Sequence, residues 1–275
     1  MSDPIQSAVT ICLVPEAKRG PFVFHSDLST GCAQASTMGF DAVEVFPRSA
    51  DEIDAAELKK ALTTHGIKLA AMGTGAGAVV QKLTLTHPDE GTRRRALDYI
   101  KAIIDLAGGF GAPAIIGSMQ GNAASPEDRE QAMTWLAEAL EQLGPRALAA
   151  GAPLLIEPLN RYESNLLNRV DLTATWLRGL KTRNIKILAD LFHMNIEEAS
   201  MGDAIRSASE LVGHVHFADS NRLAMGMGHS DVGGVVKALA DVKYQGYASA
   251  EVFPQPDSAA AARQTLKMFR ECFPR

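Results

Sequence analysis

The sequence predicts a (β/α)8 barrel, in which eight parallel strands close into a cylinder inside a ring of helices. Short apolar runs alternate with longer amphipathic segments almost from end to end. Eight such runs occur in 275 residues, or about 34 residues per unit. The runs are apolar nearly throughout, which is typical of parallel strands buried on both faces. No linker or shift in composition divides the chain, so we expect residues 1–275 to form a single domain.

Each apolar run is an expected strand, namely residues 8–14, 42–46, 67–72, 114–117, 153–157, 185–190, 212–217 and 247–253. The segments between them repeat apolar residues with the helical period. In residues 92–107, for example, Ala96, Ile100 and Ile103 share one face. Glycine closes many helices because it readily adopts the left-handed conformation. We assign this role, just before the next strand, to Gly39, Gly66, Gly151 and Gly246.

A doubly wound open sheet could be built from the same units. Such a sheet usually carries a glycine-rich phosphate-binding turn after its first strand. Here the first apolar run continues into Pro15, Glu16 and Ala17, and the glycine-rich stretch 73–77 lacks the GxGxxG spacing. We therefore predict a closed barrel, with its chemistry at the carboxyl ends of the strands.

The composition argues against several classes of protein. The formal net charge is −5, so no overall positive field exists to hold a nucleic acid. The three cysteines stand far apart, which argues against a disulfide scaffold or a thiolate metal site and fits a reducing compartment. No apolar run reaches the roughly 18 residues of a membrane span, and the N-terminus is unlike a signal peptide. We expect a cytoplasmic protein without nucleic-acid or membrane partners.

Four expected strands end in polar residues that a buried strand does not need. These residues, which stand at or near the carboxyl ends of the fifth to eighth runs at separations of 33, 26 and 35 residues, are Glu157, Asp190, His216 and Glu251. Each separation is close to one repeat, so each side chain stands at a similar height on a neighbouring strand. Since side chains alternate along a strand, all four are expected to point into the mouth of the barrel.

Three carboxylates that converge with one imidazole would repel one another strongly without a cation between them. Oxygen-rich ligands with one nitrogen suit Mn²⁺, Mg²⁺ or Co²⁺. The sequence therefore predicts a divalent metal held by Glu157, Asp190, His216 and Glu251. Two further polar residues are expected nearby. His214 lies one layer deeper and is expected to be a hydrogen-bonded core or supporting residue, and Glu44 is expected at the pocket edge.

At these same residues the chain resembles a known family. The segments that carry the resemblance are IEPLNRYE (156–163), LADLFHMNIEE (188–198), HVHFADSNR (214–222) and AEVF (250–253). They look like the xylose-isomerase-like TIM-barrel superfamily of sugar isomerases and epimerases. Within it they resemble the ketose 3-epimerases that act on D-tagatose, D-psicose and L-ribulose. The similarity is good over roughly residues 150–272 and only architectural before them.

The resemblance implies a sugar epimerase that moves a proton through a cis-enediolate. It implies Glu157 and Glu251 as the catalytic acid–base pair, in addition to their place in the metal set. It also implies substrate contacts from His193, Arg222 and Glu163. Mn²⁺ is the implied metal, a ketose or sugar phosphate the implied substrate, and a homodimer or homotetramer the implied assembly.

Other functions remain open. The same site would serve an aldose–ketose isomerase acting on a sugar, a sugar phosphate or a hydroxypyruvate-type substrate, because the proton only has to return to the adjacent carbon. A non-catalytic sugar-binding barrel and an apurinic-endonuclease-like metalloenzyme are weaker alternatives. The loop 16–27, with Lys18 and Arg19, and the segment GSMQGN (117–122) depart from the epimerase pattern and leave the substrate open.

Overall fold

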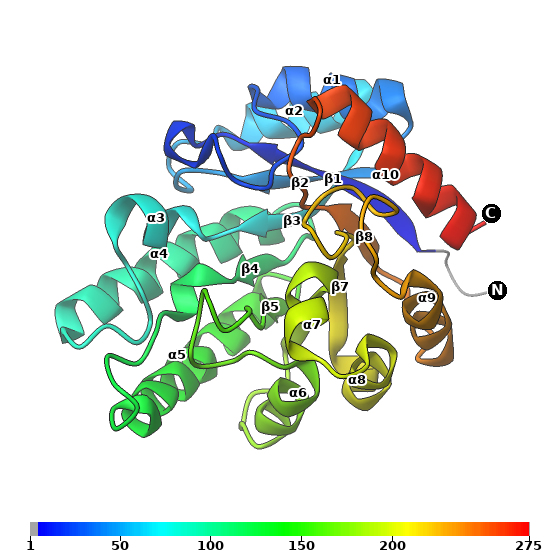
Figure 1. Ribbon diagram of the computed structural model, residues 1–275. Helices are drawn as coiled ribbons and strands as arrows, with labels where there is room; N and C mark the ends of the chain where they lie inside the picture. Colours follow the sequence, from blue (N-terminus) through cyan, green and yellow to red (C-terminus); the bar gives the residue numbers. More distant parts are fainter. Residues whose placement is uncertain (1–4, 275) are drawn as a thin grey trace.

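The computed structural model describes residues 5–274, which form a closed barrel of eight parallel strands in the order β1 to β8 (Figure 1). The strands are β1 (Gln6–Cys12), β2 (Ala42–Phe46), β3 (Lys68–Gly73), β4 (Ala114–Ile116), β5 (Leu154–Ile156), β6 (Ile185–Asp190), β7 (Val212–His216) and β8 (Tyr247–Ala250). The predicted fold class is confirmed. Each strand pairs with the next along the chain, and β8 closes the barrel against β1.

Helices surround this cylinder (Figure 1). They are α1 (Leu28–Met38), α2 (Ala55–His65), α3 (Ala76–Gln81), α4 (Glu90–Gly108), α5 (Arg129–Ala149), α6 (Val170–Arg178), α7 (Leu191–Glu197), α8 (Met201–Ala208), α9 (Val232–Asp241) and α10 (Ser258–Cys272). Two of the expected units contain an extra helix, because α3 precedes α4 after β3, and α7 precedes α8 after β6. None of the helices described here is both long and apolar enough to cross a membrane.

Local sequence explains where several helices begin and end. Asp54 accepts the N–H groups of Ala56 and Glu57 at the start of α2, as an N-cap residue does. Gly39 and Gly66 close α1 and α2 in the left-handed conformation, as predicted. The prediction for Gly246 is wrong: α9 already ends at Asp241, and Gly246 stands directly before β8.

The strand ends decide where the polar residues stand. The expected bounds of β6 are confirmed, whereas β5 ends at Ile156 and β8 ends at Ala250. Glu157 and Glu251 therefore follow their strands directly, at the carboxyl end of the barrel. A register shift between Ile187 and Leu188 places Asp190 of β6 opposite His216 of β7.

A small apolar cluster occupies part of the barrel interior. It consists of Ala71, Ile115, Leu155 and Leu188, from four different strands. Leu155 and Leu188 stand two positions before Glu157 and Asp190 in the sequence, so the alternation expected along each strand is observed. Most of the remaining hydrophobic core forms one large cluster to which both strands and helices contribute.

Candidate metal centre and active-site pocket

Four neighbouring strands bring Glu157, Asp190, His216 and Glu251 together at the carboxyl end of the barrel. Each residue offers one ligand atom, and these four atoms lie within 4.8 Å of one another. Nδ1 of His216 lies 3.3 Å from Asp190 Oδ2 and 3.4 Å from both Glu157 Oε1 and Glu251 Oε2. The structure therefore brings together all four residues that the strand-end pattern selected.

Burial and the neighbouring charged groups together shift the pKa values of the residues in this cluster. Burial raises the pKa of Glu157, and the nearby His216 only partly opposes it. Burial acts on Asp190 in the same direction, but His193 and His216 hold the pKa of this carboxyl below its ordinary range. Burial alone would lower the pKa of His216, yet the carboxylates around it raise that pKa well above the usual value. Buried carboxylates of this kind need positive charge beside them.

The donor atoms fit a divalent metal ion. Neighbouring ligands on a small octahedral ion stand about 3 Å apart when each is about 2.1 Å from the ion. The separations of 3.3 to 3.4 Å from His216 Nδ1 are close to that value. Oε1 of Glu157 is buried and has no hydrogen-bond partner within the described chain, so this acceptor is free to bind a cation. The cluster can hold a divalent metal.

His193 provides a hydrogen-bond donor beside the cluster. It lies on α7 and is 1% exposed. The backbone N–H of Asn160 donates to its Nδ1 over 3.2 Å, so Nδ1 is an acceptor and Nε2 carries the hydrogen. Nε2 lies 3.7 Å from Asp190 Oδ2 and 3.9 Å from Glu157 Oε1, and no residue of 5–274 accepts its hydrogen. An N–H donor is therefore free to bind a ligand.

Arg222 links the candidate ligand cluster (Glu157, Asp190, His216 and Glu251) to the rim of the pocket. Its Nη2 donates to Glu251 Oε2 over 2.7 Å, and its Nη1 donates to Glu163 Oε1 over 3.3 Å. The guanidinium lies 4.8 Å from the ring centroid of Phe192, a cation–π distance. Its Nε is buried and has no partner in the described residues. All three residues implied as substrate contacts, His193, Arg222 and Glu163, thus line one space with the cluster.

This space is a pocket of about 280 Å³ at the carboxyl end of the barrel. Six of the seven predicted site residues line it, namely Glu157, Glu163, His193, His216, Arg222 and Glu251. Its apolar part includes Phe22 and Phe46, whose ring centroids are 4.6 Å apart. Arg222 is the one arginine or lysine among the described residues that line the pocket, and Glu251 and Glu163 already bind it. Lys18 instead lines a separate hollow.

Two residues that sequence reasoning did not single out lie next to Glu157. A Cβ at Gly117 would collide with Glu157 Oε2, so the glycine leaves room for this carboxylate in its observed position. Gln120 is fully buried, donates to the Glu157 carbonyl over 3.0 Å and accepts the N–H of Leu167 over 3.3 Å. Both belong to GSMQGN, the segment that departs from the epimerase pattern. The one sequence signal for this segment was its departure from the epimerase pattern.

The end of the HMNIEE motif clamps the loop between β5 and α6, which carries Glu163. Glu197 accepts the backbone N–H of Arg161 over 2.6 Å and its guanidinium over 2.9 and 3.0 Å. Glu198 accepts the N–H of Val170, the first residue of α6, over 2.6 Å. Adjacent glutamates thus fix both ends of the loop. Sequence reasoning used these residues only as part of a motif.

Asp219 organises the loop after β7 and was also missed. This carboxylate is 2% exposed. It accepts hydrogen bonds over 2.7 to 3.0 Å from four backbone N–H groups, those of Ser220, Gly226, Gly228 and Ser230. Its own carbonyl accepts the N–H of Arg222 over 2.8 Å. Arg222 has φ of 59°, a conformation that residues other than glycine rarely adopt. Asp219 therefore supports the backbone conformation that presents Arg222.

We expect Asp219→Asn to lower the free energy of unfolding by about 3 kcal/mol near neutral pH, because four backbone N–H donors lose a charged acceptor. Burial alone would raise the pKa of Asp219, but the N–H groups of Ser230, Ser220 and Gly228 lower it to about 2. A depressed pKa stabilises the fold above the unfolded-state value of about 3.9, and this stabilisation is lost as the pH falls toward 2. Urea unfolding of both proteins at pH 7 and pH 3 measures the difference. If the difference in free energy of unfolding between the two proteins is as large at pH 3 as at pH 7, this account is contradicted.

A closed barrel with an oxygen-rich, single-imidazole cluster at its carboxyl end is the arrangement expected of a metal-dependent (β/α)8 enzyme. The chain belongs to the xylose isomerase-like TIM barrel family, whose sequence model matches residues 32–272. This confirms the resemblance found in the sequence motifs.

The relatives are epimerases, which are isomerases that act on carbohydrates. The chain is 30% identical to the D-psicose 3-epimerase of Agrobacterium fabrum over 244 residues, or 86% of this chain and 80% of that protein. It is 31% identical to the L-ribulose 3-epimerase of Mesorhizobium japonicum over 234 residues, or 83% and 76% of the two chains. The solved D-psicose 3-epimerase of Clostridium cellulolyticum H10, with D-tagatose, shares the fold at a TM-score of 0.82. That match has 21% identity and covers 98% of this chain and 99% of the other.

Proposed function

We propose that this protein is a metal-dependent ketose 3-epimerase that acts on an unphosphorylated ketose. One observation carries the proposal: two glutamates from the outer strands of the four-strand arc meet at the same imidazole. Glu157 follows β5 and Glu251 follows β8, and each places an oxygen 3.4 Å from His216 Nδ1. The two carboxylates are the proposed proton-transfer groups, and the relationship to named 3-epimerases supports this role.

The chemistry requires removal of a proton from the carbon next to a ketone. That hydrogen is only weakly acidic, because its loss leaves negative charge on the ketone oxygen as an enediolate. A divalent cation, when bound, supplies positive charge at this oxygen and at the neighbouring hydroxyl. One glutamate takes the proton from C3, and the other returns a proton to the opposite face of the same carbon. The configuration at C3 is thereby inverted.

Two N–H donors are available to hold the sugar oxygens. Nε2 of His193 and Nε of Arg222 are both buried and have no acceptor in the described chain. Sugar oxygens are proposed to accept from these two groups, since buried donors generally require an acceptor. Glu163, on the clamped loop, is 43% exposed and is proposed to contact a hydroxyl at the far end of the sugar.

The lining of the pocket favours a free ketose over a ketose phosphate. A phosphate group needs cationic side chains or a cluster of free N–H donors. The cationic Arg222 is already bound to Glu251 and Glu163, and the apolar wall around Phe22 and Phe46 offers no positive charge. The curated relatives named above are epimerases of unphosphorylated ketoses by name.

The endonuclease alternative finds no support in the pocket. An endonuclease of this kind would need additional histidine ligands at the ends of the third and fourth strands. In the described structure Gly73 ends β3 and Ser118 follows β4, and both line the pocket. An aldose–ketose isomerase would use the same residues as the epimerase. The two enzymes are therefore distinguished by the experiment below.

The test is incubation of the metal-loaded protein with ketoses and ketose phosphates in D₂O, followed by NMR. We expect deuterium to enter at C3 of an unphosphorylated five- or six-carbon ketose, together with the C3 epimer. Exchange only at C1 or C2, with formation of an aldose, would replace the proposal by the isomerase. No exchange in any sugar would contradict both enzymes and favour a binding protein.

We also propose Mn²⁺ as the native metal, a cytoplasmic location and a homodimer or homotetramer. Mn²⁺ accepts the mixture of three carboxylates and one imidazole that the cluster offers. The net charge of −5 supports the prediction of no nucleic-acid partner. Metal analysis of the purified protein and its mass in solution test the first and last of these proposals.

A further inference from the structure

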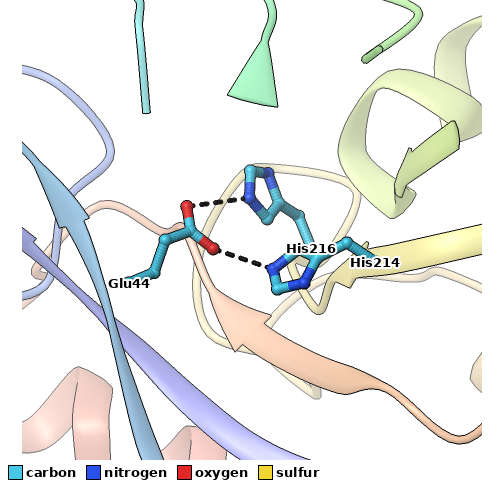
Figure 2. Close-up of side chains that lie close together, drawn as sticks. All are labelled: Glu44, His214 and His216. Carbon is cyan, nitrogen blue, oxygen red and sulfur yellow. Dashed lines mark hydrogen bonds and ion pairs between the residues drawn. The ribbon is translucent and has the colours of Figure 1, made fainter. Parts of the chain in front are cut away.

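The two ring nitrogens of His216 face two different environments. Nδ1 faces the carboxylates of the ligand cluster, as described above. Nε2 faces Glu44, with 3.1 Å between Nε2 and Glu44 Oε1. Glu44 comes from β2 and reaches the imidazole from the other side of the barrel interior (Figure 2). His216 is therefore held between the ligand cluster and a carboxylate outside it.

The second oxygen of Glu44 is also engaged. Its Oε2 lies 2.8 Å from Nε2 of His214, so one carboxylate joins both histidines of β7 (Figure 2). Glu44 is 5% exposed, and each of the two histidines is 1% exposed. A carboxylate so deeply buried, with both oxygens bound to imidazole nitrogens, has little freedom to move.

This arrangement decides which nitrogen of His216 can bind a cation. An ionised carboxylate only accepts hydrogen bonds, so Nε2 of His216 carries a hydrogen toward Glu44. A neutral imidazole has one N–H, which leaves the lone pair on Nδ1, the nitrogen that faces the ligand cluster. Carboxylate–histidine–metal arrangements of this kind orient the ring and increase the basicity of the ligand nitrogen.

We propose that Glu44 is a positioning residue for the metal centre: it fixes the ring and tautomer of His216, and His214 in turn fixes Glu44. The inference rests on the proposed metal site. Sequence reasoning placed Glu44 only at the pocket edge and did not connect it with the histidines. The echo of AEVF (250–253) by VEVF (43–46) was the one signal available.

The test measures Mn²⁺ binding to metal-free protein by calorimetry, without a sugar. We expect one ion per chain and a Kd that rises about 10- to 100-fold in Glu44→Leu, because an outer hydrogen-bond partner is lost. Glu44→Gln keeps an oxygen that can accept from His216, so its Kd is expected to rise less than that of Glu44→Leu. This partial rescue separates positioning of His216 from a general loss of packing.

The control is Ser7→Ala. Ser7 is buried at the opposite end of the barrel, where its hydroxyl donates to Asp41 over 2.8 Å. Its loss is expected to lower the melting temperature and leave the Kd for Mn²⁺ unchanged.

NMR gives a second measurement of the Glu44 contact. In Mg²⁺-loaded, ¹⁵N-histidine-labelled protein, the hydrogen-bonded Nε2 proton of His216 is expected at low field. That signal should disappear in Glu44→Leu and remain in Glu44→Gln.

Three outcomes would overturn the proposal. The first is a Kd in Glu44→Leu equal to that of the unmodified protein, which would make Glu44 merely structural. The second is binding of two ions per chain with loss of one in Glu44→Leu, since Glu44, His214 and His216 would then form a metal site of their own. If Glu44→Leu does not fold, Glu44→Ala, which also lacks the acceptor, takes its place, and an unchanged Kd in that variant would be the third. Because no sugar is present, these results are independent of which carbon the enzyme epimerises.

Discussion

Glu251→Gln is expected to reduce epimerisation by about 10²- to 10⁴-fold, the usual contribution of a general acid–base group. Glutamine has nearly the same size and cannot take up a proton at neutral pH. Its amide oxygen can still accept the hydrogen bond that Arg222 Nη2 donates to Glu251 Oε2 over 2.7 Å, so the pocket keeps its shape. The measurement is the rate of deuterium entry at C3 of the ketose in D₂O, together with the rate at which the C3 epimer forms.

A loss of metal has to be separated from the loss of the base, because Glu251 also belongs to the ligand cluster. The variant is therefore loaded with excess Mn²⁺ and its metal content is measured before the assay. Glu90→Gln is the matched control, since Glu90 lies on α4 with 76% of its side chain exposed and is expected to leave turnover unchanged. A fully loaded Glu251→Gln enzyme with turnover within ten-fold of the unmodified protein would rule out the two-carboxylate mechanism.

Removal of the metal is expected to abolish activity and to lower the melting temperature. A ligand that binds only the folded protein stabilises it by about 2.7 kcal/mol when its concentration is 100 times Kd. For a domain of this size, 1 kcal/mol corresponds to about 2 to 4 °C. Chelation of protein held in such an excess of Mn²⁺ should therefore lower the melting temperature by about 5 to 10 °C. Calorimetric scans with and without EDTA provide the measurement.

Asp190→Asn is the control for this experiment. Oδ1 of Asp190 accepts the N–H of Phe192 over 2.8 Å at the start of α7, and an asparagine oxygen can do the same. The variant should therefore fold, yet its melting temperature should respond little to EDTA because a charged ligand is gone. An equal response in both proteins would show that the metal binds elsewhere.

The meeting of Glu157, Asp190, His216 and Glu251 could be predicted from the sequence because it follows from two periodicities. Residues at one repeat spacing reach the same height on neighbouring strands, and alternation along each strand sends Glu157 and Asp190 inward. Both properties belong to the backbone, and neither depends on how loops are arranged. The same logic predicted the number of strands; it missed the end of α9, placed at Gly246, and the two additional helices α3 and α7.

The supporting contacts could not be predicted, because they depend on how side chains meet across the fold. Glu44 meets His216 from the other side of the barrel, and the sequence separates the two by 172 residues. Asp219 acts through a loop whose backbone turns four N–H groups toward one carboxylate. No periodic pattern encodes such a loop. Gly117 could be understood only after the position of Glu157 Oε2 was known.

The seven residues of helix α7 connect three parts of the site. It begins directly after Asp190, carries His193 at its third position and ends at Glu197, which clamps the loop with Glu163. Deleting or inserting one residue inside this helix would rotate everything beyond it by about 100°. Such a change would misdirect His193 or Glu197 relative to Asp190. The length of this short helix is therefore constrained at both ends, by the position of Asp190 before it and by the contact of Glu197 with Arg161 at its last residue.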